Sequence, residues 1–212
     1  MQILLQDVLP EGIPTPRPNH PIWQRELKLD TSNNYLIKGS SGHGKSTLLH
    51  ILSGVRRNFS GQLYFDEVNA RTHTNHQWAN IRQNQISVVY QDLKLLPHLT
   101  GRQNLLLKTK LQKAVEDEQI DVFASDLGIE PCLDQSCERL SYGQRQRLAI
   151  VRALLQPFHF LLLDEPFSHL DPANVEMALN LIHKVCSEKK SGILLTTLHE
   201  EHGFPYDELL EV

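Results

Sequence analysis

The residues with the clearest chemistry form a glycine-rich loop suited to binding phosphate. The loop lies between an expected strand at 35–38 and an expected helix from Lys45 to about Ser53, and it reads Gly39, Ser40, Ser41, Gly42, His43, Gly44, Lys45 and Ser46. Glycines let the backbone curl so that successive N–H groups point at phosphate oxygens, and the helix start adds partial positive charge. Lys45 would reach the β and γ phosphates, and Ser46 would offer its hydroxyl to Mg²⁺. The order strand, loop, helix favours a nucleoside-triphosphate site over a glycine-rich turn that binds nothing.

An acidic pair is the second candidate for chemistry. The apolar stretch 158–163 ends in Asp164 and Glu165. Because successive side chains of a strand point to opposite faces, the two carboxylates can take different roles. Asp164 would hold the Mg²⁺ shell, and Glu165 would polarise a water for in-line attack on the γ phosphate. A solvated strand end is the simpler interpretation of the acids alone, but beside a phosphate loop they indicate hydrolysis.

A second helix, expected from Ser141 to Gln156, also begins with residues that suit an anion. Ser141 and Gln144 have the spacing of a capping box, which is the structural explanation, while Gly143 is not needed for a cap. The N–H groups of such a helix start can bind a phosphate. Two of these sites are hard to place around one nucleotide in a small domain, so the pattern suggests two copies, each completing the other's site.

The elements that must position these residues alternate between strands and helices, which predicts an α/β fold with a largely parallel sheet. We expect strands at 26–30, 35–38, 61–65, 85–90, 158–163, 193–198 and 208–212, and helices at 45–53, mostly over 101–130, at 141–156 and from Asp171–Pro172. Five prolines between Leu9 and Pro21 predict an extended N-terminal segment that is not helical.

Composition narrows the class of protein. The 212 residues are enough for one domain, and the formal net charge of −4 does not favour a nucleic-acid binder. We find no apolar run of about 20 residues, as a membrane helix requires, and no signal peptide at the start. Cys132, Cys137 and Cys186 form no CxxC pair, so we expect reduced thiols in a cytosolic protein instead of a zinc site.

Six motifs in order resemble the nucleotide-binding domain of ATP-binding cassette (ABC) ATPases, over nearly the whole chain. Tyr142 stands where that family's LSGGQ signature has its first glycine. The matching segments are Gly39–Thr47 (Walker A), Gln91 (Q-loop), Leu140–Gln144 (signature), Leu161–Glu165 (Walker B and the catalytic glutamate), Ser168–Asp171 (D-loop) and His199 (switch histidine). The resemblance implies a P-loop NTPase (RecA-like) core with a small antiparallel β part and an inserted α-helical subdomain. It also implies one domain over 1–212, with the core at 1–90 and 146–212 and the helical subdomain at about 91–145.

The same resemblance assigns expected roles and the cofactors ATP and Mg²⁺. The residues expected in catalysis are Glu165, His199, Gln91 and Lys45. Those expected to bind the nucleotide are Gly39, Ser40, Ser41, Gly42, His43, Gly44, Lys45, Ser46, Thr47, Ser141, Gly143 and Gln144. Those expected to hold the metal are Ser46, Gln91 and Asp164.

The stretch around Gln91 resembles one branch of the family. The sequence here is similar to that of the ATPases of lipoprotein release (LolD), macrolide export (MacB) and cell division (FtsE). The similar positions are Ile81–Arg82, the segment 86–100 and Asn104. This resemblance implies an ATPase pair that drives membrane permease subunits mechanically. The chain would then be cytoplasmic and held at the inner (cell) membrane through the permease, as a homodimer or paired with another ATPase subunit, with no nucleic-acid partner.

Some departures from the family pattern keep other functions open. The family usually stacks adenine on an aromatic residue upstream of Walker A, where this chain offers only His20 or Trp23. A nucleotide-binding regulator that does not hydrolyse ATP therefore stays an alternative, as does an ABC-type ATPase acting on DNA or ribosomes. A small GTPase does not fit, because the chain has no NKxD motif.

Overall fold

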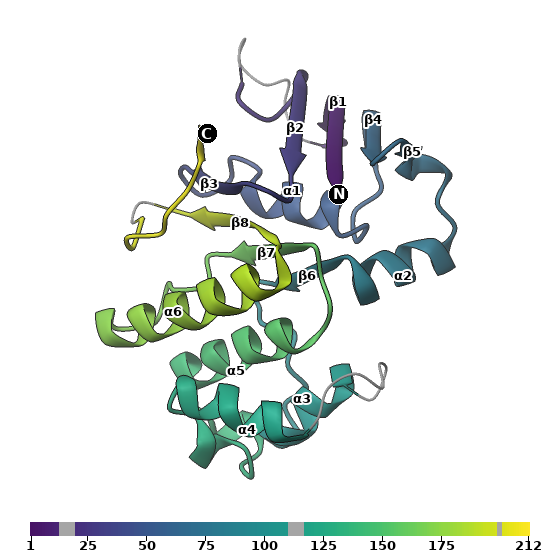
Figure 1. Cartoon of the computed structure of the whole chain (residues 1–212). Coiled ribbons are helices and arrows are strands. Elements are labelled where there is room, and N and C mark those ends of the chain that lie inside the picture. The colour runs from purple at the N-terminus through teal and green to yellow at the C-terminus, as the bar shows by residue number, and fades with distance from the viewer. Residues whose placement is uncertain (13–19, 110–116, 199–200) are drawn as a thin grey trace.

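Two β-sheets lie on opposite sides of helix α1 (Lys45–Leu52) in the computed structural model, which describes residues 1–12, 20–109, 117–198 and 201–212 (Figure 1). Within these ranges the first sheet is antiparallel and four-stranded, in the order β2-β1-β4-β5. Its strands are β1 (Gln2–Pro10), β2 (Glu26–Asp30), β4 (Phe59–Phe65) and β5 (Val68–Asn69). This sheet is the small antiparallel part that the sequence led us to expect.

Strand β1 is an element that the sequence analysis did not predict. Its apolar residues Ile3, Leu5 and Val8 are completely buried, which explains why the segment pairs with both β2 and β4. The pairing with β4 shifts register between Gln6 and Leu9, where Asp7 has a φ of 51°. The expected extended segment thus begins with a paired strand through Pro10, and residues 13–19 of that prediction lie outside the described ranges.

The second sheet is parallel and carries the candidate site. Its described strands follow the order β6-β7-β8-β3-β9. They are β3 (Asn34–Lys38), β6 (Ile86–Val89), β7 (Phe160–Asp164), β8 (Gly192–Thr197) and β9 (Glu208–Glu211). All pairings in this sheet are parallel, as the alternation of strands and helices predicted. Their carboxyl ends therefore meet at one edge.

Side-chain alternation along β7 shows how this sheet separates two cores. Phe160 and Leu162 pack with α1 and the antiparallel sheet, whereas Leu161 and Leu163 pack with the helices of the other face. By the same period of two, Asp164 continues the row that faces α1. The strand thus delivers its terminal carboxylate to the side on which the glycine-rich loop enters its helix.

The remaining helices complete the layers (Figure 1). Helices α5 and α6 cover the face of the parallel sheet opposite α1, and α3 and α4 lie beyond α5. The bounds are α2 (Asn75–Asn84), α3 (Gly101–Thr109), α4 (Asp117–Asp126), α5 (Tyr142–Leu155) and α6 (Pro172–Lys189), with short 3₁₀ turns at Ala70–Thr72, Glu130–Cys132 and Cys137–Arg139. Helix α2 was not predicted.

Helix ends follow local chemistry. Asp171 caps α6 by accepting a hydrogen bond from the Asn174 N–H, as the Asp-Pro pair predicted. The helical region predicted at 101–130 contains α3 and α4, and the chain leaves α4 through Gly128, whose φ is 59°. In the parts of the chain that the structure describes, no helix is both long and apolar enough to cross a bilayer.

Candidate functional site

The glycine-rich loop joins the carboxyl end of β3 to the start of α1. Gly42 and Gly44 have φ values of 85° and 90°, a conformation that glycine adopts readily and other residues rarely do. Helix α1 has no side-chain cap and no acidic residue in its first turn. Because the first N–H groups of a helix have no partner within it, this uncapped end is suited to receive an anion.

Lys45 places its ammonium inside this loop. Its Nζ donates hydrogen bonds to the carbonyl oxygens of Gly39 (2.6 Å) and Ser40 (2.9 Å) and lies 3.7 Å from the Glu165 carboxylate. The side chain is only 4% exposed. The positive charge is therefore held inside the phosphate loop, between its first two carbonyls and Glu165, where it is available to a bound phosphate.

The acidic pair lies at the carboxyl end of β7, where Asp164 is the last strand residue and Glu165 follows it, and the two residues differ in environment. The Asp164 side chain is buried and accepts a hydrogen bond from the Thr196 hydroxyl (2.8 Å). Glu165 leaves the strand with a φ of 49°, and its N–H donates to the Thr196 carbonyl and hydroxyl oxygens, each at 3.2 Å. This turn carries the Glu165 carboxylate towards Lys45.

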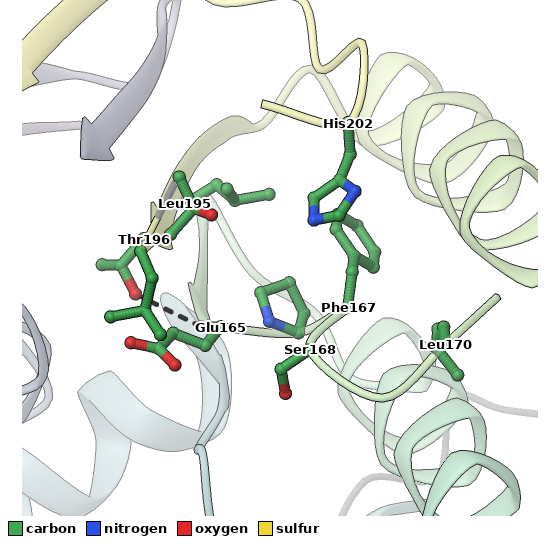
Figure 2. A pocket seen from close by; sticks show the side chains of 10 residues that line it. Glu165, Phe167, Ser168, Leu170, Leu195, Thr196 and His202 are labelled. Atoms are coloured by element: carbon green, nitrogen blue, oxygen red, sulfur yellow. Dashed lines mark hydrogen bonds between the residues drawn. The ribbon is translucent and has the colours of Figure 1, made fainter. Parts of the chain in front are cut away.

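Figure 2 shows Glu165 and Thr196 side by side at one end of a cavity of about 270 Å³. Phe167 and His202 line its far side, with their rings 5.5 Å apart in an edge-to-face contact. The cavity therefore opens directly beside the candidate hydrolytic carboxylate.

Gln91 follows β6 at the same edge of the sheet. Val89 of β6 pairs with Leu163 of β7. Gln91 lies two residues after Val89 and Glu165 lies two residues after Leu163, so both residues leave the sheet at the same level. Gln91 is exposed, and its backbone carbonyl accepts a hydrogen bond from the Tyr142 hydroxyl (2.8 Å). The structure thus places the loop that carries Gln91 next to the start of α5.

The start of α5 is a complete capping box. The Ser141 hydroxyl accepts from the Gln144 N–H (3.2 Å), and the Gln144 side chain accepts from the Ser141 N–H (2.8 Å). Gly143 lies close to another loop, since a Cβ there would be 3.2 Å from the His169 carbonyl oxygen. Capping and an anion site remain compatible, because the cap uses neither of the amides of Tyr142 and Gly143.

The other predicted site residues do not all lie at this sheet edge. Ser46 and Thr47 are half-buried in the first turn of α1, and His43 is exposed in the loop. The prediction for His199 falls on a residue outside the described ranges. The structure therefore brings together the phosphate loop, the acidic pair and Gln91 at one sheet edge, and places Ser141, Gly143 and Gln144 on a separate helix start.

The two residues considered for the adenine differ in access. Trp23 is 2% exposed and lies under the phosphate loop, so its ring supports Gly44. The His20 ring is more open, and its Nδ1 accepts hydrogen bonds from the N–H groups of Ile22 (3.2 Å) and Trp23 (3.3 Å). Burial, and then the charge of His43, lower the pKa of His20. Of the two, only His20 has ring surface available to a ligand.

Sequence reasoning missed two polar residues that hold the acidic pair. Thr196 contacts both Asp164 and Glu165, and the buried Gln146 donates to the Glu165 carbonyl oxygen (3.3 Å). The sequence did hold a signal for Thr196. It follows the apolar run 193–195 of an expected strand, and neighbouring parallel strands end at the same sheet edge, so Thr196 could be expected near Asp164. No local pattern distinguishes Gln146 from the polar residues around it.

A lysine-bearing loop at a helix start, facing an acidic strand end across a parallel sheet, defines a P-loop nucleoside triphosphatase. Comparisons with known proteins make the class specific. Residues 24–168 match the ABC transporter family. The chain belongs to that family, and it is an ABC-type ATPase.

Solved structures agree in fold. The dimeric structure of a bacterial ABC transporter cassette superposes with a TM-score of 0.82 at 25% identity, covering 99% of this chain and 94% of that one. A post-hydrolysis state of that cassette, bound to ADP and Pi, gives a TM-score of 0.77 at 26% identity, with 93% and 88% covered. The predicted α/β P-loop NTPase fold is confirmed.

Curated relatives are importer ATPases by name. The thiamine import ATP-binding protein ThiQ of Haemophilus influenzae is 38% identical over 175 residues, covering 81% of this chain and 78% of that protein. ThiQ of Yersinia pestis is 35% identical over 175 residues, covering 81% and 72%. These relatives do not specifically support the LolD, MacB and FtsE branch expected from the segment around Gln91, and their names denote import.

Proposed function

We propose that this chain is the ATP-hydrolysing subunit of an ABC importer whose substrate is thiamine or a chemically similar compound. The observation that carries the proposal is the match to thiamine import ATP-binding proteins over most of the chain. The intact phosphate loop and acidic pair support hydrolysis, in contrast to a regulator that only binds nucleotide.

In the proposed mechanism, the loop amides and Lys45 hold the β and γ phosphates of ATP. Ser46, Asp164 and Gln91 would hold Mg²⁺, and their hydroxyl, carboxylate and amide oxygens are the hard donors that this ion prefers. Bound Mg²⁺ would neutralise charge that develops on the phosphate oxygens. The buried Asp164, fixed by Thr196, is suited to such a permanent ligand role.

Glu165 would direct the attacking water. The water oxygen forms a bond to the γ phosphorus, the bond from that phosphorus to the β–γ bridging oxygen breaks, and Glu165 takes the water proton. ADP and inorganic phosphate result. In this proposal His199 contacts the γ phosphate, as the family resemblance implies.

The proposed assembly pairs two ATPase copies, or this chain with a related subunit. The start of α5, with Ser141, Gly143 and Gln144, would then contact the nucleotide of the partner subunit. The dimeric form of the structurally similar cassette supports this arrangement. Closing of the pair around ATP and reopening after hydrolysis would supply the mechanical work. Within each copy we retain the division into a core (1–90 and 146–212) and a helical subdomain (about 91–145).

The proposed location is the cytoplasmic face of the cell membrane, where the chain would bind permease subunits. The segment 91–100, between β6 and α3, is the proposed contact. Leu96 in this segment is 49% exposed, an apolar surface suited to a protein partner.

Turnover tests the hydrolytic part of the proposal. The purified chain should hydrolyse Mg-ATP, and Glu165→Gln should lower kcat at least 100-fold while ATP stays bound in a closed dimer, because the general base is lost. Unaltered turnover of Glu165→Gln would remove Glu165 from this role, and an inactive unmodified chain would favour a regulator.

Copurification tests the importer part. A tagged Glu165→Gln chain should capture its permease from native membranes, and cells that lack the permease should lose uptake of labelled thiamine. Capture of a four-helix permease with a large periplasmic domain would instead support lipoprotein release or macrolide export. Capture of DNA or ribosomes would contradict a transport role.

A further inference from the structure

Tyr142 makes a contact that the glycine of the family signature could not make. As the first residue of α5, it donates a hydrogen bond from its hydroxyl to the Gln91 carbonyl oxygen (2.8 Å) across 51 positions of sequence. Its ring also lies 4.2 Å from the ring of His169, with the planes inclined at 49°. One side chain therefore joins the loop of Gln91, the start of α5 and the loop of Ser168–His169.

The contacts continue from His169 to the candidate catalytic base. His169 Nδ1 lies 2.9 Å from the Ser168 hydroxyl, and that hydroxyl accepts from the Gln146 amide (3.4 Å). The same amide donates to the Glu165 carbonyl oxygen (3.3 Å). A continuous set of polar and ring contacts thus runs from the backbone of Gln91 to the backbone of Glu165.

The ring of Tyr142 is itself held in place. The Arg145 guanidinium lies over it, 5.5 Å from the ring centroid, and the capping box below it orders the first turn of α5. Because Arg145 and His169 both contact the ring and restrict its rotamers, the Tyr142 hydroxyl loses little conformational entropy when it bonds to Gln91.

We propose that Tyr142 is a positioning residue that couples the loop of Gln91 to the start of α5 and to the Ser168–His169 loop. This inference rests on the proposed function, in which Gln91 serves the nucleotide of its own copy and the start of α5 serves that of the partner. Movement of Gln91 towards one nucleotide would thereby move the helix start that completes the other site.

Two substitutions distinguish the contribution of the Tyr142 hydroxyl from that of its ring. Tyr142→Phe removes only the hydrogen bond to Gln91, and Tyr142→Gly restores the family residue and removes the ring contact as well. Tyr64→Phe, on β4 of the antiparallel sheet, is the matched control for loss of a tyrosine hydroxyl.

We expect Tyr142→Phe to lower kcat about fivefold, the effect of one uncharged hydrogen bond. ATP affinity of the monomer should stay within twofold of the unmodified chain, since the start of α5 that Tyr142 positions would serve only the partner's nucleotide. Amide hydrogen exchange of residues 91–96 should become about fivefold faster in Tyr142→Phe and stay unchanged in Tyr64→Phe. An unchanged kcat or unchanged exchange in this segment would overturn the inference.

A double-mutant cycle tests the second contact. The effects of Tyr142→Gly and His169→Ala on kcat should be clearly less than additive, because each removes the same ring contact. Additive effects would show that the loops are not coupled through Tyr142. These outcomes are distinct from failure of the proposed function, which would appear as absent Mg-ATP hydrolysis in the unmodified chain.

Discussion

The ammonium of Lys45 lies 3.7 Å from the carboxylate of Glu165, and both side chains are nearly buried. The same ammonium donates to two loop carbonyls. A phosphate that enters the loop would compete with these carbonyls and with Glu165 for the lysine. The phosphate carries a negative charge that the carbonyls lack, and the 3.7 Å separation from Glu165 is longer than a hydrogen bond. Binding of ATP would thus draw Lys45 away from Glu165 and leave that carboxylate available to a water.

Loss of the Lys45 charge should therefore weaken nucleotide binding directly. We expect Lys45→Met to lower ATP affinity at least tenfold, because the phosphates lose their one buried cation in the described part of this loop. Titration with a fluorescent ATP analogue measures the change. Lys28→Met, which removes an exposed lysine on β2, should have no effect, and equal affinities for the two variants would contradict the assignment.

Thr196 should matter for the acidic pair although it is not itself expected to touch the substrate. Thr196→Val keeps the shape but removes the hydroxyl that orients Asp164 and receives the Glu165 N–H. We expect kcat to fall about tenfold and stability to fall by about 1–3 kcal/mol, the cost of unsatisfied buried groups. ATPase rates across a Mg²⁺ titration and denaturant unfolding measure the two effects.

Thr196→Ser is the control for this prediction, because it retains the hydroxyl. It should recover most of the activity that Thr196→Val loses. If serine were as impaired as valine, packing of the methyl group, and not the hydrogen bond to Asp164, would be the cause.

These residues show which parts of the site a sequence can predict. The phosphate loop could be predicted because its strand, glycines and Lys45 are contiguous in the sequence. The apolar stretch before Asp164 and Glu165 could be predicted for the same reason. The contact between Thr196 and Asp164 is 32 positions apart and depends on the parallel register of β7 and β8. The apolar run 193–195 indicates a strand that ends near Thr196, but no local pattern gives the register that pairs Thr196 with Asp164.

The main features of the fold could be predicted, but β1 and α2 were not. Alternating strands and helices predicted the parallel sheet. Strand β1 was not predicted, because the five prolines from Pro10 to Pro21 indicate an extended segment, whereas the alternation of the buried Ile3 and Leu5 lies before them. Helix α2 was missed because it is mostly polar and buries only Trp78 and Ile81. Its capping box, with Thr74 and Gln77, was the available signal.

Packing under the phosphate loop gives a prediction on stability. A Cβ at Gly44 would lie 2.9 Å from the indole nitrogen of Trp23, and the φ of 90° there strains any residue except glycine. We expect Gly44→Ala to destabilise the chain by about 2–4 kcal/mol, from overpacking and backbone strain together. Denaturant unfolding measures this loss.

Gly42→Ala is the matched control, because Gly42 has a similar φ of 85° but open space around its Cβ position. It should cost only about 1–2 kcal/mol of backbone strain. Trp23→Phe should in turn reduce the penalty of Gly44→Ala. Equal losses for the two glycine variants would show that the contact with Trp23 is not limiting.

Lys108 gives a prediction on pH dependence. Burial, then the positive charges of Arg152 and Arg82, lower the pKa of this lysine from 10.5 to about 8. The unfolded chain therefore binds more protons than the folded chain between about pH 8 and 10.5, so this group makes stability rise with pH across that window. Below pH 8 both states are protonated, and the full penalty of the buried charge is present.

Replacement of Lys108 with methionine should remove that penalty. We expect Lys108→Met to stabilise the chain at pH 7 by up to about 3 kcal/mol, the free energy that corresponds to the pKa shift, and the gain should shrink towards pH 10. Denaturant unfolding of both proteins from pH 7 to 10 measures the difference, in which the titrations of other groups cancel. Lys28→Met, at an exposed position, should show no such trend. A gain that is constant with pH would mean that packing of the methionine, and not loss of the buried charge beside Arg152 and Arg82, stabilises the variant.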